Sequence, residues 1–281
     1  MLVVRDLPTL RDATARLRAE RGGLAFVPTM GALHAGHLAL VAAGKRAGGA
    51  VAASIFVNPL QFGPNEDLAR YPRDEEGDLD KLRAAGCDLA WLPDVPTMYP
   101  EGAATTVTVD GPPAALWEAE QRPGHFRGVA TVCCKLFSQV EADLAFFGEK
   151  DWQQVQVVSR MVRDLDLPLR IVPVPTVREP DGLALSSRNR FLAPAERALA
   201  PALHAAMQAA VARLRAGEAP APVLAEAAAG LVRQGFGAVD YLALVEAATL
   251  RPLAALPPAG TGRLLAAARL GAVRLLDNLP V

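Results

Sequence analysis

The feature that most restricts the fold is a series of short, continuous apolar segments that alternate with helix-like stretches through the first two thirds of the chain. The apolar segments lack a polar residue at every second position, which is typical of strands covered on both faces. Strand–helix–strand alternation predicts a parallel sheet with right-handed crossovers. The predicted strands span residues 24–28, 51–57, 88–92, 143–147 and 169–174, and the predicted helices span residues 38–47, 74–85, 126–140 and 152–164.

The last third of the chain has a different pattern, which indicates a smaller α+β domain. We predict a Rossmann-like parallel-sheet domain over residues 1–176 and a C-terminal α+β domain over residues 177–281, with the boundary in a proline-rich stretch. Residues 105–109, with the sequence TTVTV, are predicted to form an edge or interface strand. The predicted C-terminal elements are helices at residues 193–217 and 220–234 and strands at residues 239–245, 262–268 and 272–276.

Composition excludes several classes of protein. Hydrophobic residues make up 51% and charged residues 21% of the chain, which is typical of a globular protein. The formal net charge of −1 lacks the basic excess of a nucleic-acid-binding protein. We expect no membrane span, because no apolar run reaches about 18 residues, and no signal peptide. Three cysteines without CxxC spacing favour a reduced, cytoplasmic protein in which Cys133 and Cys134 are packing residues.

The first chemical motif is PTMGALHAGH at residues 28–37, between a predicted strand and a predicted helix. Gly31 and Gly36 allow a ligand to approach the backbone closely. His34 and His37 are three residues apart, so they share one face of the first helical turn. The free N–H groups at the start of the helix favour an anion, and we interpret the motif as a phosphate site. The alternatives are surface histidines or a metal site, although the other two histidines form no obvious ligand set with them.

The second motif, FVNPLQFG at residues 56–63, directly follows the second strand. Asn58 and Gln61 offer neutral donors and acceptors, which bind a hydroxy acid without repelling its carboxylate. The alternative is a polar loop cap.

Two further motifs carry positive charge. In FFGEKDWQQ, at residues 146–154, Lys150 offers a compact charge for a phosphate, and Asp151 is predicted to cap the next helix. In VREPDGLALSSRN, at residues 177–189, Ser186, Ser187 and Arg188 are suited to hold a triphosphate from the opposite side. The alternatives are an exposed loop lysine and a helix N-cap region.

These four strings resemble one family. HAGH is similar to the HxGH motif of the nucleotidyltransferase superfamily, and PTMGALHAGH resembles the pantothenate synthetases, or pantoate–β-alanine ligases. VNPLQF, FFGEKDWQQ and VREPDGLALSSRN match the same family in order across residues 28–189. Trp152 stands where the family usually has Tyr, and Leu185 stands where Met is usual.

The resemblance implies ATP-dependent ligation of (R)-pantoate and β-alanine through pantoyl-adenylate, with release of AMP and pyrophosphate. It also implies ATP with Mg²⁺ as substrate, no metal ligands from the protein, a homodimer, and a C-terminal domain that acts as a lid. The expected catalytic residues are His37, His34, Lys150 and Arg188. The expected ATP-binding residues are Met30, Gly31, Ala32, Leu33, His34, Ala35, Gly36, His37, Gly148, Glu149, Lys150, Asp151, Val177, Leu185, Ser186, Ser187 and Arg188. The expected residues for pantoate or β-alanine are Gln61, Gln154, Asn58 and Met30.

Some roles are finer hypotheses. His37 is the candidate proton donor toward pyrophosphate, because histidine titrates near neutral pH. Asp78 aligns with an aspartate of the family. Glu118 either meets the ribose, orders a lid or is solvated. The loop at residues 65–74 is expected to exclude water from the acyl-adenylate.

Three other functions remain open from the residues alone. One is a nucleotidyltransferase of the same superfamily with another acceptor, and one is an aminoacyl-tRNA synthetase, which the charge balance disfavours. The third is a non-catalytic nucleotide sensor. An assay of ATP–pyrophosphate exchange with and without pantoate separates these possibilities.

Overall fold

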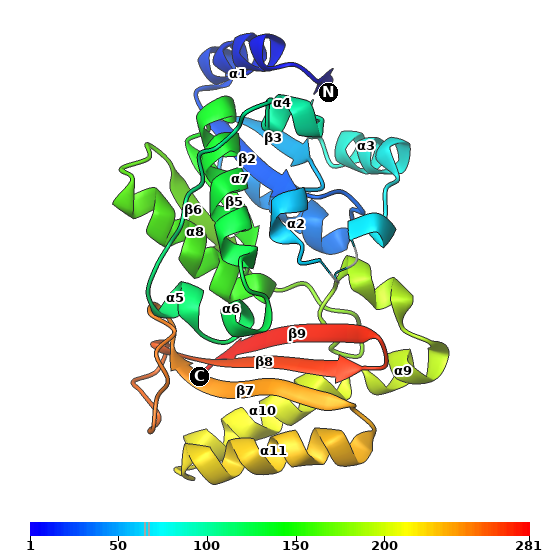
Figure 1. The fold of residues 1–281 in the computed structure, drawn as a ribbon, viewed down its shortest axis with the longest axis vertical. Coiled ribbons are helices and arrows are strands. Elements are labelled where there is room, and N and C mark those ends of the chain that lie inside the picture. Colours follow the sequence, from blue (N-terminus) through cyan, green and yellow to red (C-terminus); the bar gives the residue numbers. More distant parts are fainter. Residues whose placement is uncertain (65, 67) are drawn as a thin grey trace.

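Six parallel strands form one sheet in the order β1-β4-β3-β2-β5-β6, which confirms the predicted fold class (Figure 1). The structure is a computed structural model that describes residues 1–281 except residues 65 and 67. Part of the loop at residues 65–74, which is expected to exclude water from the site, therefore lies outside the described residues. The strands are β1 (Leu2–Val4), β2 (Leu24–Thr29), β3 (Ala50–Ile55), β4 (Leu89–Trp91), β5 (Leu144–Gly148) and β6 (Arg170–Val174).

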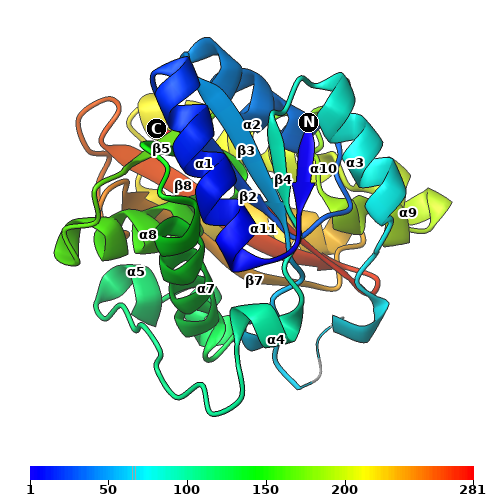
Figure 2. The same ribbon diagram turned by 90° about the horizontal axis from the view of Figure 1, so that it is seen from above.

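Helices cover both faces of this sheet, which is why its strands have no polar alternation (Figure 2). Phe26 of β2 faces one apolar core, with α1, α7 and α8. Its neighbours Ala25 and Val27 face a second core, with α2 and α3. The helices of this domain are α1 (Leu7–Arg21), α2 (Ala35–Arg46), α3 (Glu75–Ala84), α4 (Val95–Met98), α5 (Pro112–Ala115), α6 (Glu118–Gln121), α7 (His125–Val140) and α8 (Trp152–Asp164).

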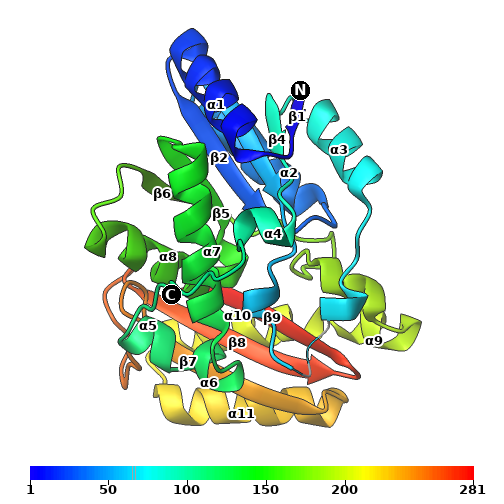
Figure 3. The same ribbon diagram turned by 45° about the horizontal axis from the view of Figure 1, so that its top comes forward.

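The C-terminal part is a three-stranded antiparallel sheet in the order β7-β8-β9, and helices cover one of its faces (Figure 1). Its other face is turned toward the parallel-sheet domain (Figures 1 and 3). The elements are α9 (Pro194–Leu199), α10 (Ala202–Arg215), α11 (Pro220–Gln234), β7 (Ala238–Glu246), β8 (Gly262–Leu270) and β9 (Val273–Pro280).

Two sequence predictions differ from the structure. Residues 105–109 form no strand; Val107 instead bonds through its N–H to the hydroxyl of Thr131 on α7. The predicted helix at residues 193–217 is two helices, α9 and α10, with Pro201 between them, because proline lacks the N–H that would continue the first helix. The sequence analysis also missed β1 and α1.

None of the described helices is long and apolar enough to cross a membrane.

Candidate active site

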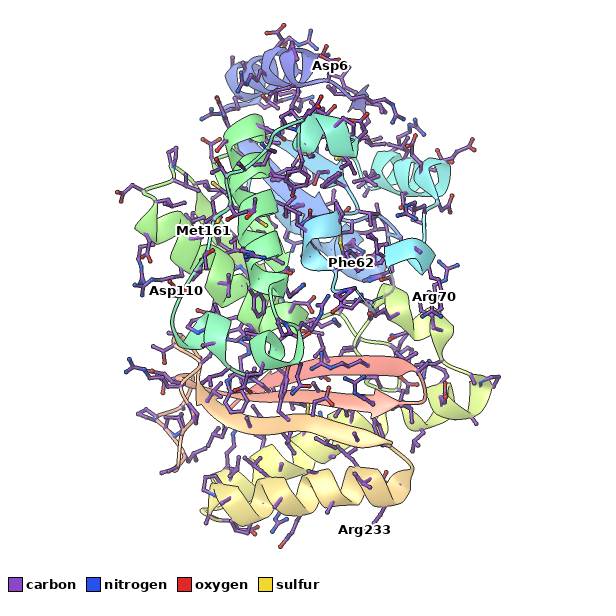
Figure 4. The ribbon with its side chains drawn as sticks, viewed as in Figure 1. Asp6, Phe62, Arg70, Asp110, Met161 and Arg233 are labelled. Atoms are coloured by element: carbon purple, nitrogen blue, oxygen red, sulfur yellow. The ribbon has the colours of Figure 1, made fainter. Side chains whose placement is uncertain are left out.

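A cleft of about 250 Å³ is lined both by residues at the carboxyl ends of the parallel strands and by residues of the C-terminal domain. Ligands in open α/β folds bind at this edge of the sheet. All four motifs contribute to the lining, so the structure brings His34, His37, Lys150 and Arg188 to one cavity. Phe62, which also lines the cleft, lies between the two sheets in Figure 4.

The start of α2 fixes the orientation of both motif histidines. The backbone N–H of Gly36 donates to His34 Nδ1 at 3.1 Å, and the backbone N–H of His34 donates to His37 Nδ1 at 3.3 Å. A nitrogen that accepts carries no hydrogen, so each neutral ring holds its hydrogen on Nε2. A side chain at Gly36 would place Cβ 2.8 Å from the His34 ring, which explains the glycine between the histidines.

Both histidines are neutral near pH 7. Burial, followed by the charge of Lys150, lowers the pKa of His34 to about 4. Burial, followed by His34, lowers the pKa of His37 to about 3. This corrects the premise that His37 titrates near neutral pH. The two imidazoles are therefore hydrogen-bond donors through Nε2 rather than ready sources of a proton.

Asp78 supports the loop that precedes these histidines. Its side chain is buried, and its carboxylate accepts from the backbone N–H groups of Ala32 at 2.6 Å and Leu33 at 2.8 Å. Gly31 has φ +80°, and a side chain there would lie 3.0 Å from the Asp78 carboxylate. Asp78 therefore shapes the loop that precedes the two histidines. Within the described residues, no group of three or more His, Cys, Asp or Glu side chains is placed to hold a metal ion.

Asn58 and Gln61 have different roles. The Asn58 amide donates to Gln61 Oε1 at 3.0 Å and to the carbonyl of Gly128 at 3.1 Å. Its oxygen accepts from Tyr99 at 2.8 Å and from the N–H of Leu60 at 3.3 Å. All four bonding positions of this buried amide are used, so Asn58 orients Gln61 although it was predicted to bind substrate.

Gln61 is the better candidate for a ligand contact. Its amide nitrogen donates to the sulfur of Met30 at 3.0 Å, and sulfur is a weak acceptor. The amide thus keeps donor capacity toward the cleft. Gln154 lines the same cleft, from α8.

The turn that carries Lys150 is held from the C-terminal sheet. Lys150 Nζ lies 3.1 Å from Asp151 Oδ1. Asn278 of β9 donates to the carbonyls of Glu149 at 2.7 Å and Lys150 at 2.8 Å. Arg263 of β8 bonds the Glu149 carboxylate at 2.6 Å. Asp151 precedes α8 as predicted, but its side chain makes no capping hydrogen bond. Burial would raise the pKa of Asp151, but the charge and hydrogen bond of Lys150, together with Arg188 and His125, lower it below the ordinary value.

The Ser-Ser-Arg segment follows a short hairpin in which Arg178 and Ala184 pair as an isolated bridge. Arg178 makes a bidentate ion pair with Asp277 of β9, at 2.6 and 2.8 Å. Burial would raise the pKa of Asp277, but His204 and Arg178 bring it below the ordinary value. The backbone N–H of Arg188 donates to Ser186 Oγ at 3.3 Å, which caps the 3-10 turn Ser187–Phe191.

Glu118 is buried, so the solvated alternative is wrong. Its carboxylate bonds Arg274 of β9 at 2.5 Å and accepts from Tyr241 at 3.2 Å. Glu118 therefore connects α6 to the C-terminal sheet.

The sequence analysis missed part of the lining. Val129, Val132, Cys133 and Leu136 form an apolar wall on α7. Their helical spacing was the available signal, but it is equally typical of core residues. Burial raises the pKa of Cys133 to about 12, so its thiol is unreactive packing at neutral pH. His125 and His204 also line the cleft.

Five of the predicted ATP-binding residues do not line the cleft. Leu33 is buried in the core, and Glu149 is turned toward Arg263. Of the others, Gly31 and Ala32 belong to the loop before His34, and Ala35 is the first residue of α2. These residues are Gly31, Ala32, Leu33, Ala35 and Glu149; the other predicted ATP-binding and substrate-binding residues all line it.

A Rossmann-like sheet whose HxGH turn, lysine turn and Ser-Ser-Arg segment meet at one cleft defines an α/β enzyme of the nucleotidyltransferase type. The family model for pantoate–β-alanine ligase matches residues 2–280. The pantothenate synthetase of Acidiphilium cryptum is 59% identical over 282 residues, with 100% of each chain covered. That of Granulibacter bethesdensis is 56% identical, covering 99% of this chain and 96% of the relative. The chain belongs to the pantoate–β-alanine ligase family and is a ligase of pantothenate biosynthesis.

Solved structures agree with this assignment. The crystal structure of pantothenate synthetase from Thermus thermophilus superimposes with a TM-score of 0.93 at 51% identity, covering 100% of this chain and 99% of that one. The pantoate–β-alanine ligase of Francisella tularensis, solved with β-γ ATP and β-alanine, has a TM-score of 0.83 at 30% identity, covering 100% and 97%.

Proposed function

We propose that this chain ligates (R)-pantoate to β-alanine at the expense of ATP, through a pantoyl-adenylate. The observation that carries the proposal is the convergence of His34, His37, Lys150 and Arg188 on a cleft that also contains neutral amides and an apolar wall. The two cations and the two neutral imidazole donors suit a triphosphate, the amides suit a hydroxy acid, and the wall suits an aliphatic body. The ATP complex of the Francisella tularensis relative supports the same substrate.

The reaction runs in two steps. A pantoate carboxylate oxygen attacks the α-phosphorus, and the bond from that phosphorus to the bridging oxygen breaks, so pyrophosphate leaves with the electron pair. The β-alanine amine then attacks the acyl carbon, AMP leaves with the electron pair of the broken C–O bond, and the nitrogen loses a proton. The protein needs no nucleophile; it positions the reactants and stabilises charge.

Each motif has a place in the first step. The Nε2–H groups of His34 and His37 donate to phosphate oxygens, and the start of α2 adds backbone donors. Lys150 supplies a point charge to the phosphates, and Arg188 acts from the C-terminal side. Ser186 and Ser187 orient the same phosphates by hydrogen bonds.

Pantoate lies against α7 in this proposal. Its carboxylate and hydroxyls accept from the amides of Gln61 and Gln154, and its methyl groups pack on Val129, Val132 and Leu136. Neutral amides avoid the repulsion that a carboxylate side chain would exert on both pantoate and ATP.

ATP enters as its magnesium complex. The buried Asp78 carboxylate is occupied by backbone N–H groups, so the phosphate oxygens and water supply the ligands of the ion.

Purified protein tests the proposal. We expect incorporation of labelled pyrophosphate into ATP only when pantoate is present, and amide formation only when β-alanine is added. Exchange without pantoate, or none with it, contradicts the assignment of pantoate as the acid. Lactate, a 2-hydroxy acid that lacks the dimethyl-substituted carbon and the terminal hydroxymethyl group of pantoate, is the control and should give little exchange.

We also propose that the chain is a cytoplasmic homodimer and that residues 177–281 act as a lid over the cleft. The family resemblance is the basis for the dimer. Sedimentation of the purified protein at twice its 29.6 kDa mass would support a dimer, and sedimentation at the monomer mass would contradict it. Closure predicts a smaller radius of gyration in small-angle scattering when ATP and pantoate are both bound.

A further inference from the structure

Two consecutive residues of β9 reach two different phosphate-handling segments. Along this strand Val273 and Leu275 pack into the core beneath the sheet, with α10 and α11. Alternation puts Asp277 on that side and Asn278 on the side of the parallel-sheet domain. In Figures 1 and 3 β9 is the strand of its sheet nearest to that domain.

Asn278 supports the turn that carries Lys150. The Glu149–Asp151 turn ends β5, and the carbonyls of Glu149 and Lys150 both accept from Asn278 Nδ2. The Asn278 side chain is buried, with 4% of the residue exposed, so water cannot replace these hydrogen bonds when they are lost. This amide fixes the backbone from which the Lys150 ammonium projects.

Arg263 fixes Asn278 in turn. Its Nε donates to Asn278 Oδ1 at 2.6 Å, which orients the amide so that its nitrogen faces the turn. The guanidinium also bonds the Glu149 carboxylate and lies 3.6 Å above the centre of the Trp152 ring. Burial lowers the pKa of Arg263, and Glu149 opposes that effect.

Asp277 supports the opposite segment. Its bidentate pair with Arg178 holds the hairpin at the point where it leads into Ser186, Ser187 and Arg188. The Asp277 carboxylate also accepts from the backbone N–H of Asn278 at 2.7 Å, so the two supports share one rigid strand segment.

We propose that Asp277 and Asn278 are positioning residues that set the separation between the Lys150 turn and the Ser-Ser-Arg segment. This inference rests on the proposed function and deepens it. Neither side chain needs to touch ATP: Asn278 acts through Lys150, and Asp277 acts through Arg178 on Arg188. A displacement of about 1 Å in such a group lowers a rate by about 100-fold, so the effect of losing either support should be large.

Double-mutant cycles test this route of action. Asn278→Ala should lower pantoate-dependent ATP–pyrophosphate exchange by about 10- to 100-fold in the native background. In a Lys150→Ala background the same change should have an effect of about twofold or less, because the group it positions is gone. Asp277→Asn paired with Arg188→Ala should behave in the same way. A role in stability alone would give equal effects in both backgrounds, and that result overturns the proposal.

Matched variants separate positioning from unfolding. Asn278→Asp keeps the size and the acceptor for Arg263 but cannot donate to the two carbonyls; a folded Asn278→Asp protein with native exchange overturns the inference. Arg269→Gln, which changes an exposed arginine near the end of β8, should leave exchange unchanged. Thermal unfolding of each variant shows whether it is folded.

A binding measurement separates this inference from the proposed function. Titration calorimetry with α,β-methylene-ATP needs no turnover, so the same cycles can be measured on affinity. Coupling of Asn278 to Lys150 in affinity supports the positioning role even if the native protein gives no exchange with pantoate. Additive affinities overturn it even if the native protein is an active ligase.

Discussion

The rings of His34 and His37 face each other with centroids 4.1 Å apart, and both accept a backbone hydrogen bond through Nδ1. This arrangement fixes the tautomer of each ring and turns two Nε2–H donors to the cleft. Burial keeps both imidazoles neutral, and a proton on either Nδ1 would also break the hydrogen bond that orients the ring. The HxGH motif in this chain is therefore a pair of preset hydrogen-bond donors.

Acid should destabilise the protein well before carboxylates are protonated. The folded pKa values are about 4 for His34, about 3 for His37 and about 4 for His125, against an unfolded value near 6.5. Between these limits the unfolded chain binds more protons, so the free energy of unfolding rises with pH and falls as pH drops below about 6.5. Urea denaturation at pH 7, 6 and 5 measures this slope.

His37→Gln supplies the matching variant for the pH experiment. The variant lacks one of the three shifted groups, so its unfolding free energy should depend less on pH by up to one proton. The same slope in both proteins would show that His37 has a normal pKa in the folded state.

Lys150 should matter for charge stabilisation far more than for folding. Lys150→Ala is expected to lower pantoate-dependent exchange by about 10²–10³, the usual effect of removing one donor to developing charge. Lys45→Ala removes a lysine of α2 that pairs with Asp88 and does not line the cleft, and it should have little effect. If the Lys150→Ala variant turned over at a rate close to that of Lys45→Ala, the role proposed for Lys150 in the reaction would be wrong.

Gln61 should determine affinity for the hydroxy acid. Gln61→Leu removes a donor to a charged ligand, worth about 1.5–3 kcal/mol, so the KM for pantoate should rise by about 10- to 100-fold. The KM for ATP should change little. Gln208→Leu, exposed on α10, is the control. A larger rise in the KM for ATP than for pantoate would place Gln61 at the nucleotide instead.

Asp78 should behave as a structural residue. Asp78→Asn exchanges one acceptor for a donor that faces a backbone N–H, so unfolding should become easier by about 1–3 kcal/mol in urea titrations. The dependence of the exchange rate on Mg²⁺ concentration should keep its midpoint. Asp80→Asn on the same helix changes an exposed carboxylate and should alter neither quantity. A shifted Mg²⁺ midpoint for Asp78→Asn alone would make Asp78 a ligand of the ion.

Local pattern was enough for the parallel-sheet elements. Each predicted strand from residues 24–28 to 169–174 corresponds to a strand within two residues at either end, because a strand buried on both faces is continuously apolar. The sequence did not predict β1 or α1. The strand β1 has only three residues and is partly exposed at the sheet edge, so it has no comparable apolar run. At residues 105–109 β-branched residues suggested a strand, but none of the strands in the described part of the chain pairs with them.

The amino-acid sequence determined which chemical groups are available. A few consecutive residues are enough to recognise the HxGH turn, the two amides, Lys150 and the Ser-Ser-Arg segment. Tertiary structure alone decided how those groups are held and charged. The low pKa values of His34 and His37 come from burial, and the supports of Lys150 and Arg178 come from Asn278 and Asp277, about 100 residues away or more. Desolvation and long-range hydrogen bonds depend on which surfaces pack together in the fold, and the spacing of residues along the chain does not specify which surfaces these are.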